Sequence, residues 1–579
     1  MTEQRPWWRV GLVVLVFAGV WTGLGMRLAY LHLGENRDLH AKVASIRSFE
    51  KDVSVARGKI YDREGNLLAL DLRTRHVSVN PTAIQEKGVG RSLAVRLGQI
   101  LDIPPATIYA TTQKPGRKQE YIAKFVHDDK VKAINELGFS EVFYDEISTR
   151  YYPQESLMSH ILGYVNYEGV GSAGIELKYN KSLRGVPGYR STQVDGEGRE
   201  ILALRSLDIA PVEGDSIYLT LDQNIQYFTE AALDRAMATN RALGAWAIVQ
   251  DVKTGEILAM ASRPTFNPNQ YNQYSDVERR NSTIGYVYEP GSIFKVASIA
   301  AILNERLFRP ADVIDCENGA WFYSGRVLRD YHAYDRLTVA DVLKKSSNIG
   351  TAKMALELGE DRLYRYLRGF GFGERTGIEL PAEEAGILHG VPSWSSLSLT
   401  RVCIGYEVGV TALQMVNMIS VFGNHGYRLK PHLIKRIVGS DGMVKYEAQP
   451  EVLSRPIRGD TARLMCKLLT RVTEPGGTGR RARFDGYTVA GKTGTAEKII
   501  DGTYSSKHNM ASFLGLVPAE DPRIAIIVVV DDPETRTGGV AAAPVFREIA
   551  ENTVKLLDIP PIPEDLTYVF NEEIPDVEQ

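Results

Sequence analysis

The longest apolar segment of the chain lies near its start. Residues 10–26 contain no charged side chain, and the apolar character continues to Leu33, interrupted only by Arg27 and His32. A helix rises about 1.5 Å per residue and the hydrocarbon core of a bilayer is about 30 Å thick, so residues 10–33 are long enough to span it. The next apolar run, residues 524–530, has only the length of a strand. The pattern predicts a single transmembrane helix.

A cleaved signal peptide is the alternative interpretation of this segment. Its apolar region would span about 7–15 residues and end at a small-residue cleavage site. The segment here is longer and continues into RLAYLHL, so we expect an uncleaved anchor. Arg5 and Arg9 precede the span together with one acid, Glu3, which favours a cytoplasmic N-terminus and an extracytoplasmic soluble body.

The pattern beyond the anchor changes near residues 211–215. Before that point, residues 57–70 predict a strand, a turn and a second strand, and residues 160–200 are rich in glycine-containing turns. After it, a short strand leads into a helix that either Thr220 or Asp222 can cap. We therefore expect a boundary between two domains at residues 211–215.

The second half of the chain mixes strand and helix patterns. Residues 246–262 are two apolar runs around Lys-Thr-Gly-Glu, which is typical of a β-hairpin. Helical patterns dominate from about 284 to 370, and strand patterns return at 487–495 and 511–530. Strands at both ends of a helix-rich middle predict an α+β domain whose sheet is built from distant segments.

Composition places the chain among ordinary globular proteins. Of its 579 residues, 24% are charged and 44% hydrophobic, and 68 Lys and Arg against 71 Asp and Glu give a formal charge of −3. Near-neutrality argues against a basic nucleic-acid-binding surface, and the proportions argue against disorder or a collagen-like chain. Cys316, Cys403 and Cys466 are too few and too far apart for a disulfide framework or a zinc site, so buried thiols are expected. The histidines are scattered, and we assign none of them to a metal or to catalysis.

Three short motifs carry candidate chemistry, and the first is EPGSIFK, with Ser292 and Lys295 three residues apart. On a helix this spacing places the hydroxyl and the amine on one face, a turn apart. A neutral lysine can take the serine proton, and burial or neighbouring cations lower the pKa of a lysine enough for this chemistry. The helix N-terminus would favour a developing oxyanion. Alone the motif is weak, because a serine N-cap before an exposed lysine gives the same pattern.

The second motif is KKSSNIG, in which Ser346 and Asn348 are separated by one residue. A turn can point both side chains into one cleft. The hydroxyl can then relay protons between an amine and a leaving group, and the amide can hold a substrate carbonyl. Alone, the motif is better interpreted as a helix cap or a polar turn.

The third motif is VAGKTGTAEK, with Lys492, Thr493, Gly494 and Thr495. The apolar lead-in and the glycine predict a strand edge along which an extended peptide can pair. Lys492 supplies charge for a carboxylate or for a proton relay, and the Thr495 N–H can complete an oxyanion hole with that of Ser292. A surface hairpin is the alternative.

In this order the three motifs resemble those of penicillin-binding proteins and class A β-lactamases, S-x-x-K, S-D-N and K-T-G. Ser347 stands where the second motif has Asp, a change that penicillin-binding proteins commonly accept. The Glu-x-x-Leu-Asn motif that carries the deacylating carboxylate of class A β-lactamases is missing between the second and third motifs. Its absence argues for slow hydrolysis and for an acyl-enzyme that awaits another acceptor.

Overall the chain is similar to class B penicillin-binding proteins, which are membrane-anchored peptidoglycan D,D-transpeptidases. Further segments that carry this resemblance are RGKIYDREGNLLA, RYYP, HILGYVN, GSAGIE, LTLDQNIQ, KTGEILAMAS and TGGVAAAPVF. The resemblance implies an elongated pedestal followed by a transpeptidase domain with an antiparallel sheet between helical regions. The expected organisation is a cytoplasmic stub (1–9), a transmembrane anchor (10–33), a dimerisation-like pedestal (34–214), the transpeptidase domain (215–557) and an acidic, disordered tail (558–579). Arg150 and Glu176 are expected to brace the pedestal.

The resemblance also implies the reaction and its residues. The donor is a stem peptide ending in D-Ala-D-Ala, Ser292 attacks its penultimate carbonyl, and an amine of a neighbouring stem resolves the ester. Lys295 is the implied base, and Ser346 and Lys492 lie in the proton path to the leaving amine. Asn348 holds the stem amide, while the residues that hold the terminal carboxylate and the backbone are Thr493, Gly494 and Thr495. β-Lactams acylate Ser292, and no metal or organic cofactor is needed.

Within the family, length, the compact N-terminal region and residues 512–533 favour the septal, division type over the elongation type. The implied location is the bacterial cytoplasmic membrane, with the catalytic domain outside the cytoplasm. The implied partners are a polytopic glycan polymerase and other division proteins, and no nucleic acid. One alternative is a β-lactam sensor, for which the cytoplasmic stub of about nine residues is too short to hold a signalling part. A second is an inactive scaffold, which would be expected to lose motif residues, and none is lost. A third is a carboxypeptidase or β-lactamase that uses water as acceptor.

Overall fold

The computed structural model describes residues 7–33, 48–53, 55–194, 200–201, 205, 207–535, 537–561 and 563. By their internal contacts, residues 1–55 with 186–212 form one compact unit, and residues 56–185 with 213–579 form another.

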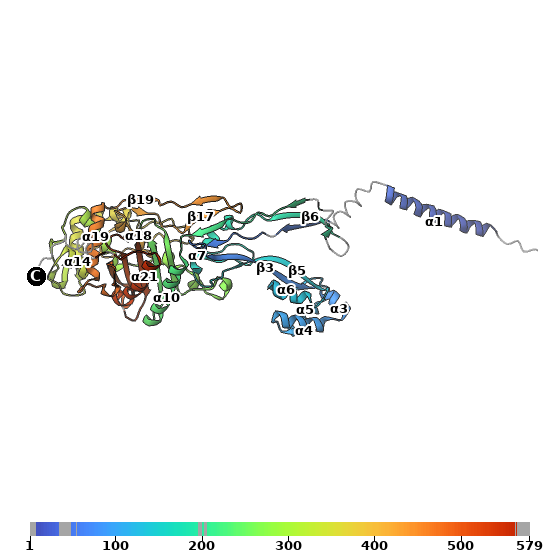
Figure 1. Ribbon diagram of the computed structural model, residues 1–579, viewed down its shortest axis with the longest axis horizontal. Helices are drawn as coiled ribbons and strands as arrows, with labels where there is room; N and C mark the ends of the chain where they lie inside the picture. The colour runs from blue at the N-terminus through green and yellow to red at the C-terminus, as the bar shows by residue number, and fades with distance from the viewer. Residues whose placement is uncertain are drawn as a thin grey trace, which may run out of the picture. The chain divides into compact units, whose positions relative to one another are not determined.

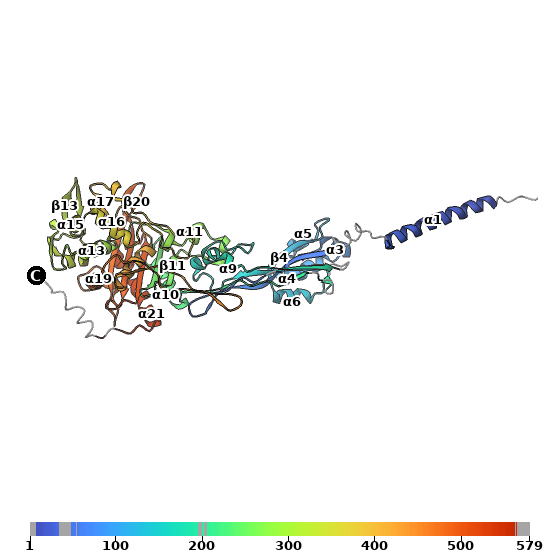
Figure 2. The ribbon, with the colours of Figure 1, turned by 90° about the horizontal axis from the view of Figure 1, so that it is seen from above.

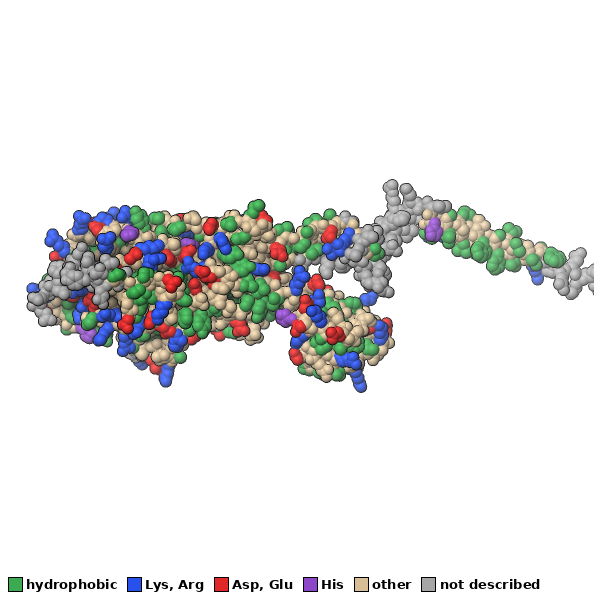
Figure 3. Space-filling model, viewed as in Figure 1, with side chains coloured by type: hydrophobic (Ala, Val, Ile, Leu, Met, Phe, Trp, Pro, Cys, Tyr) green, Lys and Arg blue, Asp and Glu red, His purple; other side chains and the backbone are tan. Residues whose placement is uncertain are grey.

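The first unit contains the apolar helix α1 (Trp7–Leu33). Within the described residues it is the one helix long and apolar enough to cross a membrane. Figure 3 shows hydrophobic side chains along its visible face. It begins three residues before the predicted span and so takes in two tryptophans, which favour the membrane interface. Its length and composition fit a membrane anchor, and its orientation stays a prediction.

The first unit also contains a small antiparallel sheet. Its central strand, β6 (Gly188–Val194), pairs with β1 (Ser48–Val53), β7 (Glu200–Ile201) and β8 (Leu207–Ile209). Two segments more than a hundred residues apart therefore make one sheet.

The second unit begins with a sheet that joins distant parts of the chain. Its order is β18-β17-β9-β2-β3-β4, with β5 also paired to β3, and all pairs are antiparallel except β2 with β9. The strands are β2 (Ile60–Tyr61), β3 (Leu67–Val79), β4 (Glu120–His127), β5 (Val142–Tyr151), β9 (Ser216–Leu219), β17 (Ile434–Val438) and β18 (Val444–Glu447). Strands β2 and β3 confirm the strand, turn and strand predicted over residues 57–70.

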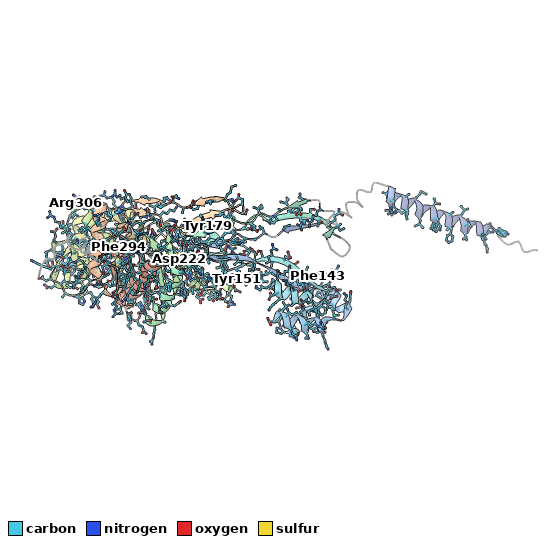
Figure 4. The ribbon with its side chains drawn as sticks, in the orientation of Figure 1. Phe143, Tyr151, Tyr179, Asp222, Phe294 and Arg306 are labelled. Atoms are coloured by element: carbon cyan, nitrogen blue, oxygen red, sulfur yellow. The ribbon has the colours of Figure 1, made fainter. Side chains whose placement is uncertain are left out.

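Four helices pack beside β3, β4 and β5, as Figure 1 shows. They are α3 (Pro81–Lys87), α4 (Gly90–Leu101), α5 (Pro105–Thr112) and α6 (Asp128–Asn135). Asn80 caps α3 by accepting the Ala83 N–H at 3.1 Å, and Pro81 occupies the first turn, where no N–H is needed. Figure 4 labels Phe143 and Tyr151 near the two ends of β5, which runs from this group of helices toward the rest of the unit.

A buried ionic cluster centres on Glu176, in the short helix α8 (Gly174–Lys178). Its carboxylate accepts hydrogen bonds from Arg57 and Arg150, each at 2.6 Å, and Arg150 also reaches Asp71 at 3.1 Å. Glu176 is fully buried, so the two arginines supply the charge that its burial requires. The predicted bracing role of Arg150 and Glu176 agrees with these contacts. Neighbouring short helices are α7 (Ser159–Leu162) and α9 (Asn180–Leu183).

The core of the C-terminal part of this unit is a five-stranded antiparallel sheet of order β11-β10-β22-β21-β20. The strands are β10 (Gly244–Asp251), β11 (Ile257–Arg263), β20 (Ala490–Ile500), β21 (Thr503–Val517) and β22 (Ile524–Asp531). They confirm the predicted hairpin at 246–262 and the strand patterns predicted at 487–495 and 511–530. Their origin in segments over two hundred residues apart is the arrangement that the α+β prediction requires.

Both faces of this sheet are buried along β10, β11 and β22, which explains why these three strands are mostly apolar. Along β10, Trp246 and Ile248 join one hydrophobic cluster while Ala247 and Val249 join a second one on the other face. The second cluster includes side chains of α10 (Gln223–Asn240) and α21 (Ala543–Leu556). Asp222, not Thr220, caps helix α10, because the Asp222 carboxylate accepts the Asn224 and Ile225 N–H groups.

The first cluster is covered by a helical region that Figure 2 shows at one end of the domain. Its main helices are α13 (Lys295–Asn304), α14 (Val339–Lys345), α15 (Asn348–Leu358), α16 (Glu360–Gly369), α17 (Ser398–Val402), α18 (Ala412–Gly423) and α19 (Gly459–Thr473). The same unit also contains the short helices α11 (Asp276–Arg279), α12 (Ser282–Gly285) and α20 (Gly538–Ala541) and the strand pair β16 (Arg428–Leu429) with β19 (Val452–Ser454). Cys316, Cys403 and Cys466 are buried free thiols, as predicted.

The prediction that helices dominate residues 284–370 is wrong for residues 313–338. This segment forms two strand pairs, β12 (Val313–Asp315) with β15 (Arg336–Thr338) and β13 (Ala320–Tyr323) with β14 (Arg326–Arg329). Ser324 and Gly325 both have positive φ and form a two-residue turn, the conformation that fits a tight hairpin.

The predicted disordered tail lies mostly outside the described residues. Its first residues are ordered against the domain, since Ile559 is buried and its carbonyl accepts a hydrogen bond from the Tyr487 hydroxyl. For residues 558–561 the prediction is therefore wrong, because an apolar side chain after α21 finds a place in the core.

Candidate active site

The candidate nucleophile lies on a tight turn before a buried helix. Ser292 is the middle residue of the 3₁₀ turn η3 (Gly291–Ile293), is partly exposed, and is followed by α13. Gly291 has φ +55°, which favours glycine, and its N–H donates to the Gly405 carbonyl at 3.1 Å. The buried Phe294, labelled in Figure 4, packs on Phe372 with ring centroids 4.7 Å apart. The nucleophile turn is thus held in place by its hydrogen bond to Gly405 and by the packing of Phe294 in the core.

Lys295 is the first residue of α13 and is fully buried. Its Nζ donates to the Ser346 carbonyl at 2.6 Å, to Ser346 Oγ at 3.2 Å and to Asn348 Oδ1 at 2.7 Å. The lysine of the first motif therefore contacts both polar side chains of the second motif.

The turn between α14 and α15 gives the second motif its shape. Ser346 has φ +61° and ends α14, while Asn348 begins α15 after Ser347 has capped it. A serine in this left-handed conformation lets one helix stop and the next begin within two residues, so the side chains on both sides of the break point toward α13. This is the arrangement that the sequence spacing predicted.

Lys492 of the third motif reaches the same hydroxyl from the opposite side. It is fully buried in β20, and its Nζ donates to Ser346 Oγ at 2.8 Å and to the Thr493 carbonyl at 3.0 Å. Ser346 Oγ therefore accepts a hydrogen bond from Lys295 and another from Lys492. The three motifs meet at this one oxygen.

Burial controls the charge of this cluster. Loss of hydration lowers the pKa of Lys295 to about 8, against the opposing effect of the Asp330 carboxylate. Burial also lowers the pKa of Lys492 well below its usual value, and the nearby charge of Lys295 lowers it further. Two ammonium groups that share one hydroxyl repel each other, so deprotonation of one lysine is favoured near neutral pH.

Strand β20 forms the outer edge of the five-stranded sheet and passes directly against the nucleophile turn. A Cβ on Gly494 would lie 2.3 Å from Ser512 Oγ and 3.0 Å from Ile293 Cγ2, so only glycine fits there. The Thr493 hydroxyl contacts that of Thr478 at 2.7 Å, and Thr495 Oγ1 accepts the Gly538 N–H at 3.2 Å.

Several residues of this site were missed by sequence reasoning. Gly405 packs so closely against η3 that a Cβ would lie 2.2 Å from the Gly291 carbonyl oxygen. Asp330 accepts hydrogen bonds from Ser347 and from the start of α15. Thr478 contacts the third motif from a loop with no signature of its own, and Gly538, within the TGGVAAAPVF segment, contacts it from the start of α20. Their sequence signals are single glycines and polar residues in loops, which are common, so only contact with the motifs identifies them.

All the residues predicted for the site lie in one region. Ser292 and Lys295 stand at the start of α13, Ser346 and Asn348 at the break between α14 and α15, and the third motif on the facing edge of β20. The arrangement combines a partly exposed hydroxyl, a buried amine of lowered pKa and an open strand edge, which suits acyl transfer from an extended peptide. The predicted oxyanion hole and the individual roles stay predictions.

Comparison with known proteins agrees with this chemistry. Residues 245–551 match the family described as the penicillin-binding protein transpeptidase domain, and residues 52–219 match the penicillin-binding protein dimerisation domain. The transpeptidase match contains all three motifs and spans more than half of the chain.

The chain is also similar to characterised proteins over most of its length. It is 32% identical to the peptidoglycan D,D-transpeptidase FtsI of Escherichia coli, over 92% of this chain and 89% of that protein. It is 29% identical to the probable peptidoglycan D,D-transpeptidase PenA of Neisseria meningitidis, over 96% and 93%. Its fold matches the crystal structure of penicillin-binding protein 3 from Mycobacterium tuberculosis in complex with aztreonam, with a TM-score of 0.70 and 28% identity over 89% and 98%. The chain therefore belongs to the class B penicillin-binding proteins and is a peptidoglycan D,D-transpeptidase.

Proposed function

We propose that Ser292 is the nucleophile of the transpeptidation, that Lys295 is its base, and that the enzyme acts in septal cell-wall synthesis. The observation that carries the residue roles is the hydrogen-bonded chain from Lys295 through Ser346 Oγ to Lys492. It links the base beside the nucleophile to a second buried amine, and so offers a path for one proton between two steps of the reaction.

In the first step the Ser292 hydroxyl attacks the carbonyl carbon of the penultimate D-Ala. Neutral Lys295 takes the hydroxyl proton, and the tetrahedral oxyanion faces the N–H groups of Ser292 and Thr495. As the C–N bond breaks, Ser346 passes a proton to the leaving D-Ala nitrogen, with Lys492 renewing the proton on Ser346. An ester on Ser292 remains, and free D-Ala departs.

In the second step an amine of a neighbouring stem attacks the same ester carbonyl. The amine loses a proton, Ser292 Oγ regains one as the ester bond breaks, and a new amide cross-link forms. The same lysine and serine groups serve in reverse, as microscopic reversibility requires. No oxidant, metal or organic cofactor enters this balance.

The donor stem is proposed to lie in extended form along β20. The edge position of this strand leaves it free to pair with a peptide backbone. Asn348 would hold the stem amide, and Thr493 and Thr495 the terminal carboxylate and the backbone, with Gly494 allowing the close approach. A β-lactam that mimics the D-Ala-D-Ala end would acylate Ser292 in the same position.

Similarity to FtsI over 92% of the chain supports the septal role, together with the sequence features that favour the division type. In this role the N-terminus lies in the cytoplasm and α1 anchors the enzyme in the cytoplasmic membrane. The proposed partners are a polytopic glycan polymerase and other division proteins. The elongation type is the competing assignment.

Labelling with a fluorescent penicillin tests the nucleophile. Wild-type protein should bind it one to one and Ser292→Ala should not, while the two proteins show the same thermal unfolding. Equal labelling of both proteins would contradict the assignment. Release of the label within minutes would favour a hydrolase, whereas formation of cross-linked peptide with an added glycan polymerase supports transpeptidation. A fluorescent fusion should gather at midcell, and sidewall patches would favour elongation instead.

A further inference from the structure

Asp330 lies beside the site although no motif contains it. It follows β14, the second strand of the β13–β14 hairpin, and its N–H donates to the Gly319 carbonyl at 3.1 Å. The hairpin is fixed to α15 by Lys353, whose Nζ pairs with Glu317 at 2.7 Å and lies 5.5 Å from the ring centre of Trp321. Asp330 is therefore held on a surface-exposed but well-anchored element.

The Asp330 carboxylate binds the turn of the second motif through both oxygens. One oxygen accepts the N–H of Asn348 and the N–H of Ile349, the latter at 3.0 Å. The other accepts the Ser347 hydroxyl at 2.6 Å. The neighbouring Arg329 carbonyl accepts the Asn348 side-chain amide at 2.8 Å. Asp330 and its neighbour thus fix Asn348 through its backbone and its side chain.

These hydrogen bonds determine which way the Asn348 side-chain amide faces. Because its Nδ2 donates to the Arg329 carbonyl, its Oδ1 is turned toward Lys295 and accepts a hydrogen bond from the lysine Nζ at 2.7 Å. Ser346 lies two residues earlier in the same turn and bonds Lys295 and Lys492. A shift of the turn would therefore disturb the hydrogen bonds of Lys295 to Ser346 and Asn348 and the bond from Lys492 to Ser346.

We propose that Asp330 is a positioning residue for acylation, which holds the turn carrying Ser346 and Asn348 against Lys295. The inference rests on the roles proposed above for these three residues. Asp330 does not touch the reacting atoms, and it acts through the turn that it binds.

The charge of Asp330 adds a second, measurable effect. Its carboxylate raises the pKa of Lys295 against the larger effect of burial, and the other ionisable groups that face this amine are Cys403 and Lys492. Removing the negative charge would destabilise the ammonium form and lower the pKa of Lys295 further. Its neutral form would then appear at a lower pH.

A simple helix cap is the competing explanation, because a carboxylate at a helix N-terminus is stabilising in itself. The same chain offers a matched control. Asp222, labelled in Figure 4, caps α10 by accepting the Asn224 and Ile225 N–H groups at 2.8 and 3.1 Å. A variant there removes an equivalent cap without touching the three motifs.

The experiment measures the second-order rate of acylation by fluorescent penicillin from pH 6 to pH 10. The full-length protein is compared with Asp330→Asn, Asp330→Ala, Asp222→Asn and Ser292→Ala, and thermal unfolding is recorded for each. We expect Asp330→Ala to lower the rate about 100-fold, the scale of a misplaced catalytic group. In Asp330→Asn the plateau rate should fall about tenfold and the acid limb should move about one unit to lower pH. Asp222→Asn should lose stability and keep the wild-type pH profile.

Wild-type rates and an unshifted profile in both Asp330 variants would overturn the inference, as would an effect that Asp222→Asn reproduces. If Asp330→Ala does not fold, Asp330→Asn and Ser347→Ala decide the matter, since each removes one partner of the 2.6 Å contact. Loss of labelling in Ser292→Ala beside unaffected Asp330 variants would refute this inference alone. Retained labelling in Ser292→Ala would refute the proposed nucleophile instead.

Discussion

The acylation rate should depend on pH through the neutral form of Lys295. This amine is fully buried at the start of α13, one turn from Ser292, and can act as a base only after it loses its proton. The perturbation to study is therefore pH itself, with Lys295→Arg as the matched variant, because a guanidinium keeps both its charge and its proton throughout the accessible range.

The structure gives the size of the effect. Burial lowers the pKa of Lys295 from 10.5 to about 8. At pH 7 about a tenth of the molecules then carry the neutral amine, roughly 300 times more than for an exposed lysine. The rate should rise about tenfold between pH 7 and pH 9 and then level off. A neighbouring ammonium disfavours a second one, so removing the charge of Lys492 should raise the pKa of Lys295 and move this rise toward higher pH.

The same shift affects folding. Because the folded state holds the Lys295 proton less tightly than the unfolded chain, burial costs about 3 kcal/mol of stability below pH 8. This cost should disappear as the pH rises from about 8 toward 10.5, so stability attributable to Lys295 increases with pH in that window. The free energy of unfolding in denaturant is compared between the wild type and Lys295→Met at pH 7 and pH 9.5, which isolates the contribution of Lys295 to the pH dependence of stability.

Stopped-flow acylation by benzylpenicillin measures the rate profile, since the carboxylate of this substrate stays ionised from pH 6 to pH 10. Lys295→Arg should lose at least 1000-fold in rate while it still folds, a loss on the scale of removing a general base and misplacing the nucleophile. A flat profile between pH 6 and pH 10, or a midpoint that persists in Lys295→Arg, would refute the assignment of Lys295 as the base.

Two further predictions concern the scaffold. Replacing Glu176 by Gln should cost about 3–5 kcal/mol of unfolding free energy, because Arg57 and Arg150 are left buried without their shared carboxylate. The control Glu548→Gln removes a solvent-exposed pair with Arg235 and should cost under about 1 kcal/mol. Equal losses of unfolding free energy in the two variants would contradict the stabilising role of the buried cluster. Replacing Gly405 by Ala should lower the acylation rate strongly and the melting temperature only slightly. The added Cβ would lie 2.2 Å from the Gly291 carbonyl oxygen, and Gly405 has φ +89°, so the variant would push the nucleophile turn toward β20. An unchanged acylation rate with a normal melting temperature would count against the close packing of this turn.

The arrangement of the candidate site was predictable where one pattern carried both spacing and chemistry. The three-residue interval between Ser292 and Lys295 places them on one helical face whatever surrounds them. The interval between Ser346 and Asn348 required a turn, and a turn is present. The prediction failed for residues 313–338, where a mixed sequence forms hairpins, and for Ile559, a single apolar residue that the core accommodates. Short segments carry too little periodic signal to separate such outcomes.

By itself, then, the sequence determined the apolar helix, the apolar strand segments and the three motifs with their order. These follow from local spacing and from the free energy of burying apolar side chains, which short stretches of chain already express. Only the tertiary structure decided three contacts. Lys295 and Lys492 share the Ser346 hydroxyl, Asp330 hydrogen-bonds the turn of the second motif, and Gly405 packs against Gly291 of the nucleophile turn. These contacts join residues up to about 150 positions apart, and they depend on close packing that no local pattern encodes.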